Sequence, residues 1–201
     1  MVRETLSLSK LKLGILISGR GSNMAAIIDA CEANEIDAEV AIVISNNANA
    51  KGLALAHKKG IPTKYVEPND FDTQAEYETV LISLIEKYQV SLICLAGYMK
   101  ILGNTFIDQF KNKIINIHPS LLPSFKGLNA QQQALDYGVQ FTGCTVHFVE
   151  KDVDSGPIIL QDIVEVKAND TQESLSDRLI KKEHQLYPKA IQWVIRNKIK
   201  G

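Results

Sequence analysis

Asn116 and His118 are the residues of this chain best suited to chemistry, because a carboxamide and an imidazole stand two positions apart. The run Lys113-Ile-Ile-Asn-Ile before His118 predicts a strand, and residues i and i+2 of a strand point to the same face. Pro119 disfavours helical geometry at His118, so we expect the pair where a strand becomes a loop. An amide donor beside an imidazolium can stabilise an oxyanion.

Asp154 lies in a second turn-rich segment, Val153-Asp-Ser-Gly-Pro157, and could complete this set. A nearby carboxylate orients a histidine and raises its pKa. Taken singly, these residues fit a core histidine and a turn cap, but three polar groups at predicted strand ends favour a site. Ser120 lacks the sharp turn of a serine nucleophile, and no spacing indicates zinc. For His57 and His147 we expect structural or surface roles.

The segment Ser18-Gly-Arg-Gly-Ser-Asn23 follows one predicted strand and opens a helix. Glycines let the backbone approach a ligand, and the amides of a helix N-terminus point toward it. Gly21, Ser22 and Asn23 therefore favour a phosphate over the alternative, a simple helix cap after a tight turn. The Gly-x-Gly-x-x-Gly fingerprint is incomplete, so we do not expect NAD.

Glu183 interrupts an apolar stripe of a predicted helix, and a buried carboxylate there needs a partner. It could accept a substrate amine, or it could form a salt bridge or be exposed by a tilt of the helix; the sequence leaves these open. The segment Tyr98-Met-Lys-Ile-Leu102 could form a pocket wall, or a loop packed on the core. The stripe that Glu183 interrupts consists of Leu175, Leu179, Leu186, Ala190 and Val194.

Apolar strands alternate with helices through most of the chain, which predicts an α/β fold with a mostly parallel, doubly wound, Rossmann-like sheet. We expect an antiparallel C-terminal addition and a long C-terminal helix, with Asp170 and Glu173 forming a capping box at its start. The predicted strands are 11–18, 38–45, 63–66, 90–96, 113–118, 142–149 and 157–166. The predicted helices are 23–33, 50–59, 73–88, 130–137 and 171 to about 198.

The 201 residues predict one domain, residues 11–201, after a flexible lead-in over residues 1–10. A nucleotide-binding half would span about 11–110 and a catalytic half about 111–201. The net charge of −1 argues against a nucleic-acid partner, and no run is long enough to cross a membrane. Three separated cysteines and the lack of a signal peptide favour a cytoplasmic protein.

Four segments together resemble the glycinamide ribonucleotide formyltransferases of purine synthesis. The block His-Pro-Ser-Leu-Leu-Pro is shared with the wider formyl-folate transferase and hydrolase superfamily, and the loop Ser-Gly-x-Gly-Ser-Asn is typical of the purine enzymes. The resemblance extends from Lys12 to Trp193. Its segments are 16–23 (LISGRGSN), 95–102 (LAGYMKIL), 115–123 (INIHPSLLP) and 145–161, which contains TVHFV and DSGPIILQ.

The resemblance implies a phosphate site at Gly21, Ser22 and Asn23, a contact from Glu183 to the glycinamide amine, and a catalytic group of Asn116, His118 and Asp154. It also implies 10-formyltetrahydrofolate as co-substrate, no metal, small-molecule partners only, and a monomer or homodimer. Gln74 stands where arginine is frequent in the family, and Asn129 where some members have histidine. The half 111–201 would bind folate, together with some residues of the other half. The implied folate contacts are Gln74, Met99, Lys100, Ile101, Leu102, Asn116, Glu150, Lys151, Asp152, Val153 and Asp154.

The implied reaction is direct attack of the ribonucleotide amine on the formyl carbon, through a tetrahedral intermediate stabilised by His118 and Asn116. Hydrolysis of formyltetrahydrofolate would use the same group, but such enzymes carry an N-terminal regulatory domain and only about ten residues precede the first strand. Transfer to methionyl-tRNA would need a further C-terminal domain and a basic face. A non-catalytic nucleotide-binding module would leave Asn116, His118, Asp154 and Glu183 without a role.

Overall fold

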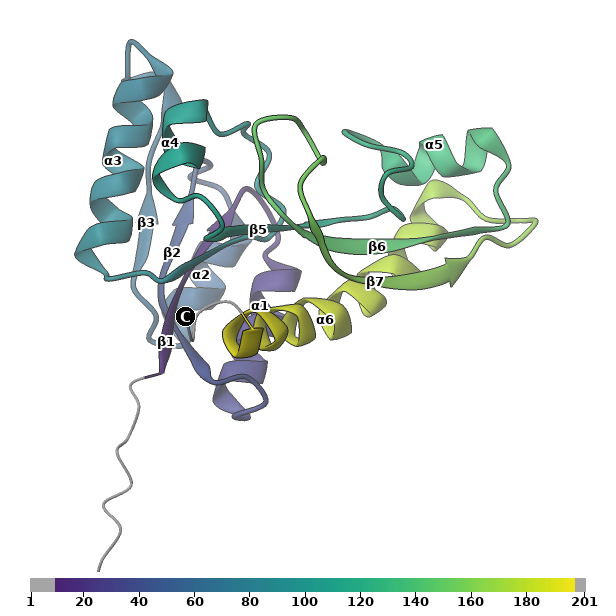
Figure 1. Cartoon of the computed structure of the whole chain (residues 1–201), viewed down its shortest axis with the longest axis horizontal. Coiled ribbons are helices and arrows are strands. Elements are labelled where there is room, and N and C mark those ends of the chain that lie inside the picture. The colour runs from purple at the N-terminus through teal and green to yellow at the C-terminus, as the bar shows by residue number, and fades with distance from the viewer. Residues whose placement is uncertain (1–9, 198–201) are drawn as a thin grey trace, which may run out of the picture.

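The computed structural model describes residues 10–197, which form one seven-stranded sheet with helices on both faces (Figure 1). The strand order is β3-β2-β1-β4-β5-β6-β7. Of the predicted lead-in over residues 1–10, all but Lys10 lies outside the described residues. The strands are β1 (Leu11–Ile17), β2 (Ala38–Ser45), β3 (Thr63–Tyr65), β4 (Leu92–Leu95), β5 (Ile114–His118), β6 (Phe141–Phe148) and β7 (Ile158–Glu165).

Strands β1 to β5 pair in parallel, whereas β6 and β7 join the sheet antiparallel, so the predicted fold class is confirmed. Two short elements were not predicted from the sequence, the 3-10 helix η1 (Pro68–Asp70) and helix α4. The helices are α1 (Ser22–Glu32), α2 (Lys51–Lys58), α3 (Gln74–Lys87), α4 (Asn104–Gln109), α5 (Ala130–Tyr137) and α6 (Gln172–Asn197).

The continuous apolar runs of the parallel strands are explained by burial on both faces of the sheet. On β1, Ile15 packs in the core that includes residues of α1 and α6, while the next residue, Leu16, packs in the core formed with α3 and α4. Alternate residues of a strand point to opposite faces, so each face needs its own apolar set. Two cores therefore fix the sheet between α1 and α6 on one side and α3 and α4 on the other.

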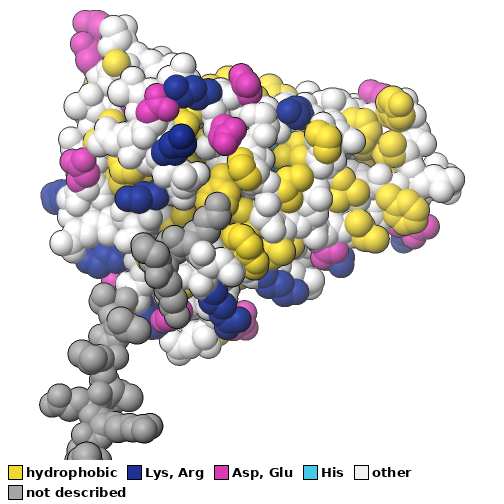
Figure 2. All heavy atoms as spheres, viewed as in Figure 1, with side chains coloured by type: hydrophobic (Ala, Val, Ile, Leu, Met, Phe, Trp, Pro, Cys, Tyr) yellow, Lys and Arg dark blue, Asp and Glu magenta, His cyan; other side chains and the backbone are white. Residues whose placement is uncertain are grey.

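The end of the sheet built by β6 and β7 is less covered. Figure 2 shows hydrophobic side chains gathered over the region where these strands lie in Figure 1. Phe141, Ile158 and Ile163 are each about half exposed there. Strand β7 is also the last strand of the sheet, so only one of its edges is paired. No helix within residues 10–197 is long and apolar enough to cross a membrane.

The carboxyl ends of the parallel strands bring distant loops together. Strand β1 lies between β2 and β4, so the chain order reverses at this point of the sheet, which is where open α/β sheets bind ligands. The amide of Ser18 after β1 donates to the carbonyl of Gly97 after β4, at 3.0 Å. The loops after β1 and β4 are thus neighbours at one edge of the sheet.

Candidate active site

Strands β5 and β6 place Asn116 directly opposite His147, because the antiparallel register pairs these two residues. The Asn116 Nδ2 atom lies 3.3 Å from His147 Nε2. His147 is buried, and its Nδ1 atom bonds the carbonyl oxygen of Phe148 at 2.8 Å, which fixes the ring. The structure therefore brings His147, for which we expected only a structural or surface role, into contact with the predicted catalytic residues.

Asp154 connects the two histidines. Its Oδ2 atom lies 3.2 Å from His118 Nδ1, and its Oδ1 atom lies 3.5 Å from His147 Nε2. The backbone amide of Gly127 also donates to Oδ2, at 2.8 Å. Burial by itself would raise the pKa of Asp154, but the bonds from His147 and Gly127 and the nearby His118 hold that pKa below its usual value. The group is therefore suited to remain a carboxylate beside two imidazoles.

His118 is almost fully buried and both of its nitrogens have acceptors. Nδ1 faces Asp154, and Nε2 lies 2.8 Å from the carbonyl oxygen of Phe125. A carboxylate and a carbonyl both accept, so both contacts are satisfied only when each ring nitrogen carries a proton. This arrangement suits the imidazolium form, but the Phe125 carbonyl occupies the direction in which a ligand would approach Nε2.

Asn116, His147 and Asp154 border a cavity of about 110 Å³, here called pocket A. Nine of the eleven predicted folate contacts line it; Met99 and Gln74 do not. The side-chain amide of Gln74 instead donates to Glu78 and to the carbonyl of Ile101. Pocket A is lined by Leu95, Tyr98, Lys100, Ile101, Leu102, Ile107, Asn116, His147, Val149, Glu150, Lys151, Asp152, Val153 and Asp154.

A second cavity of about 370 Å³, pocket B, surrounds the start of helix α1. Gly21 caps this helix with a φ of 75°, and an added Cβ there would lie 2.8 Å from the Cα of Gly52. Among residues 10–197 no side chain caps the helix, so its first amides are available to bind an anion. Pocket B is lined by Ser18, Gly19, Arg20, Gly21, Ser22, Asn23, Ala96, Gly97, Met99, Ile117, Pro119, Gln131, Ile180 and Glu183.

Glu183 faces pocket B from helix α6 and is only 7% exposed. It accepts a hydrogen bond of 2.7 Å from the side-chain nitrogen of Asn23. Burial raises the pKa of Glu183 above its ordinary value, and the bond from Asn23 offsets part of this. The Oδ1 atom of Asn23 is buried with no hydrogen-bond partner among the described residues. A ligand donor between Asn23 and Glu183 would satisfy both acceptors.

The two pockets adjoin at the ends of β4 and β5. Met99 lines pocket B and the next residue, Lys100, lines pocket A; Ile117 lines pocket B and Asn116 lines pocket A. The site can therefore hold two ligands in neighbouring pockets, with Asn116 at the border of pocket A.

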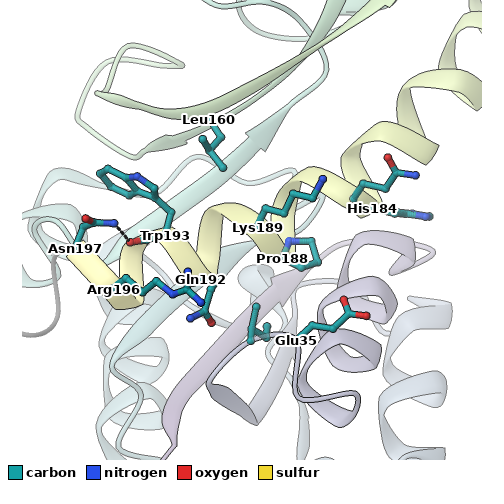
Figure 3. A pocket seen from close by; sticks show the side chains of 11 residues that line it. Glu35, Leu160, His184, Pro188, Lys189, Gln192, Trp193, Arg196 and Asn197 are labelled. Carbon is teal, nitrogen blue, oxygen red and sulfur yellow. Dashed lines mark hydrogen bonds between the residues drawn. The ribbon is translucent and has the colours of Figure 1, made fainter.

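A larger cavity, of about 580 Å³, lies elsewhere along helix α6 (Figure 3). Its walls include Leu160, His184, Pro188 and Trp193. None of the predicted site residues lines it, so its size does not make it the better candidate.

Comparison with known proteins assigns the chain to a family. A family model described as formyl transferase matches residues 11–191. Phosphoribosylglycinamide formyltransferase of Escherichia coli (strain K12) is 41% identical over 190 residues, which cover 94% of this chain and 90% of that protein. A solved structure, glycinamide ribonucleotide transformylase 1 from Symbiobacterium toebii, is 45% identical with a TM-score of 0.90, covering 92% of this chain and 87% of that one.

A longer relative matches as well. The trifunctional purine biosynthetic protein adenosine-3 of Gallus gallus is 44% identical over 193 residues, which cover 96% of this chain and 19% of that protein. The chain thus spans about a fifth of the length of this relative. These matches agree with the resemblance found in the sequence, and the chain belongs to the formyl transferase family, among the phosphoribosylglycinamide formyltransferases.

Proposed function

We propose that this protein transfers the formyl group of 10-formyltetrahydrofolate to the amine of glycinamide ribonucleotide, a step of purine synthesis. The observation that carries the proposal is the meeting of pockets A and B beside the cluster of Asn116, His118, His147 and Asp154. Folate would occupy pocket A and the ribonucleotide pocket B. The names of the Escherichia coli and Symbiobacterium toebii relatives support the choice of ribonucleotide.

Pocket B suits a phosphorylated amine. The free amides at the start of α1 supply donors for a phosphate, and the glycines at 19 and 21 leave room for its oxygens. The unpartnered Asn23 Oδ1 atom and the Glu183 carboxylate supply acceptors for the hydrogens of an amine. Asn23 would thus serve the amine through its side chain, in addition to the phosphate contact that the sequence predicts for it.

Pocket A suits a flat, partly apolar ring. Its walls come from Tyr98, from residues 100–102 and from residues 149–154, and they include the apolar side chains of Ile101 and Val153, which are 71% and 50% exposed. Exposed apolar side chains at a pocket mouth gain from covering by a ligand. Asn116 at the inner end would donate to the formyl oxygen.

In the proposed reaction the ribonucleotide amine attacks the formyl carbon, and the carbonyl oxygen becomes an oxyanion. Imidazolium His118 and the Asn116 amide stabilise that charge. The formyl oxygen replaces the Phe125 carbonyl as acceptor for His118 Nε2, so residues near Phe125 move aside when the donor binds. Asp154 orients His118 through its Nδ1 atom, and His147 lies beside the Asn116 amide.

The tetrahedral intermediate then collapses. The bond between the formyl carbon and N10 breaks, tetrahydrofolate leaves with a proton on N10, and the amine nitrogen gives up a proton through water held near Asp154. Positioning of the two substrates supplies a large share of the rate in such transfers. Atoms and charge balance without a covalent enzyme intermediate.

One assay tests the proposal. The protein is mixed with 10-formyltetrahydrofolate, with and without glycinamide ribonucleotide, and tetrahydrofolate is followed over time. Product that requires the ribonucleotide supports transfer. Product formed equally without it would assign a hydrolase, and absence of product in both mixtures would contradict a role in formyl transfer.

A further inference from the structure

The outer wall of pocket A is held by very few backbone bonds. Residues 98–102 connect β4 to α4, and within the described part of the chain they make no backbone–backbone hydrogen bond. Four members of this wall nevertheless line the pocket: Tyr98, Lys100, Ile101 and Leu102. Side chains from outside the segment must therefore define its shape.

Helix α3 supplies two of these side chains one turn apart. The Nε2 atom of Gln74 donates to the carbonyl of Ile101 at 3.0 Å, and to Glu78 Oε1 at 2.8 Å. The same Glu78 oxygen accepts from the backbone amide of Gly103 at 2.5 Å. Gln74 and Glu78 thus bind the end of this segment at two backbone groups, the carbonyl of Ile101 and the amide of Gly103.

The burial of Glu78 makes this contact more than a surface bond. Glu78 is only 3% exposed, although it is charged and lies on a helix with a solvent face. A carboxylate is rarely buried unless its oxygens accept hydrogen bonds. The amide of Gly103, which precedes the first turn of α4, and the amide of Gln74 meet this need.

Gly103 fits the contact closely. A Cβ added at this position would lie 2.8 Å from Glu78 Oε2, which requires a shift, and 3.2 Å from Gln74 Nε2, which is a tight contact. The φ of Gly103 is −77°, so the backbone conformation itself does not demand glycine. The lack of a side chain at 103 is therefore explained by the approach of Glu78 and Gln74.

The same helix fixes the start of the wall. The hydroxyl groups of Tyr77 and Tyr98 lie 2.5 Å apart in a buried bond, and the ammonium of Lys100 lies 5.2 Å from the Tyr77 ring. Helix α3 thereby contacts the segment at both ends, and pocket A depends on a helix that contributes none of its lining residues.

We infer that Gln74 and Glu78 are positioning residues for the formyl donor. Through Ile101 and Gly103 they keep the wall of residues 98–102 in the conformation that binds the folate ring. The inference rests on the proposed function, since it assigns pocket A to folate. It also gives Gln74 a role different from a direct ligand contact. Neither Gln74 nor Glu78 lines pocket B, and Met99 is the one residue of the 98–103 segment that does, so the larger effect of their loss is expected on folate.

Kinetics of single variants test the inference. Glu78→Ala should raise the KM for 10-formyltetrahydrofolate and the Kd for tetrahydrofolate roughly tenfold, and Gln74→Ala roughly threefold, on the scale of lost hydrogen bonds. The KM for the ribonucleotide should rise much less than the KM for 10-formyltetrahydrofolate, and kcat at saturating folate should fall by less than about threefold. Glu78→Gln keeps an acceptor oxygen for Gly103 and should stay close to the wild type.

Gly103→Ala tests the same contact without removing the side chain of Gln74 or of Glu78. It should weaken tetrahydrofolate binding through the clash of its Cβ with Glu78. Glu86→Ala is the matched control, because Glu86 on the same helix bonds Gln109 of α4 at 3.1 Å, away from pocket A. Unchanged tetrahydrofolate binding in Gln74→Ala and Gly103→Ala would overturn the inference, as would equal losses for both substrates. A wild-type protein that does not bind tetrahydrofolate would instead overturn the proposed function.

Discussion

His118 is the residue on which the chemistry depends most directly. We expect His118→Ala to lower kcat by at least roughly a hundredfold, because an oxyanion donor or acid–base group is lost. The KM for the ribonucleotide should change little, since His118 does not line pocket B. Steady-state kinetics with both substrates measures this. His57→Ala, at an exposed histidine near the end of α2, is the control, and near-normal turnover of the His118 variant would refute its role.

Glu183 shows how binding and stability can conflict at one residue. Its raised pKa means that the folded protein holds the proton more tightly than the unfolded chain does. The ionised side chain therefore destabilises the fold at neutral pH, and this penalty disappears as the pH falls below the pKa of an unfolded glutamate. An amide at 183 would carry no such penalty and could donate to the free Oδ1 atom of Asn23.

We therefore expect Glu183→Gln to be more stable at pH 7 by about 1 kcal/mol or more, and to raise the KM for the ribonucleotide about tenfold or more. Thermal unfolding at pH 7 and at pH 4 checks the first part, since the gain should shrink at the lower pH. Asp177→Asn, at an exposed position of the same helix, should show neither effect. A variant less stable than the wild type at pH 7 would contradict this account of Glu183.

The residue scale also shows what sequence can reveal about the site. The spacing of Asn116 and His118 was informative because both lie on one strand. His147 was missed because its place beside Asn116 depends on the antiparallel register of β5 and β6, which are separated by a long connection. The available signal was the alternation in Thr145-Val-His-Phe, which puts Thr145 and His147 on one face of a strand.

At the scale of elements, long periodic segments were predicted well and short ones were not. Helix α4 has six residues, and only Phe106 and Ile107 are buried, so it leaves no repeating pattern in the sequence. The start of α6 was predicted one residue too early. Thr171 and Ser174 exchange the capping bonds, at 3.0 and 3.2 Å, while Asp170 pairs with Arg178. Pairing with a residue two turns away overrode the local capping pattern.

The contact between α1 and α2 is expected to control the phosphate loop. An added Cβ on Gly52 of α2 would lie 2.5 Å from the Cδ1 atom of Ile17 and 3.2 Å from the Cα atom of Gly21. Gly52→Ala should therefore push the loop outward, destabilise the fold by about 1–3 kcal/mol, and raise the KM for the ribonucleotide more than that for folate. Thermal unfolding and kinetics measure both effects.

The control for this variant is Ala54→Ser, at an exposed position of the same helix. It should leave both KM values unchanged. Equal increases in both KM values for Gly52→Ala would show that the substitution disturbs the sheet as a whole, which would contradict a specific effect on the start of α1.

In the molecule as a whole, hydrogen bonds from helix α6 connect the site to the sheet. The hydroxyl group of Tyr187 donates to the carbonyls of Leu95 on β4 and Ile115 on β5, at 3.0 and 3.1 Å. These two strands end where pockets A and B adjoin, and Glu183 lies one turn before Tyr187 on α6. Helix α6 thereby connects β4 and β5 with an acceptor in pocket B.

Because each pocket depends on a different helix contact, the two ligands should stabilise the fold independently. A ligand that binds only the folded chain, at a hundredfold excess over Kd, adds about 2.7 kcal/mol, or roughly 5–10 °C in Tm for a domain of this size. Tetrahydrofolate and glycinamide ribonucleotide should each raise the Tm of the wild type in thermal-shift measurements. A threefold weaker Kd removes about 0.65 kcal/mol, so Gln74→Ala should lose about a quarter of the folate shift, and Gly52→Ala should lose more of the ribonucleotide shift than of the folate shift. If either variant lost both shifts equally, pockets A and B would act as one unit and the division of ligands between them would be wrong.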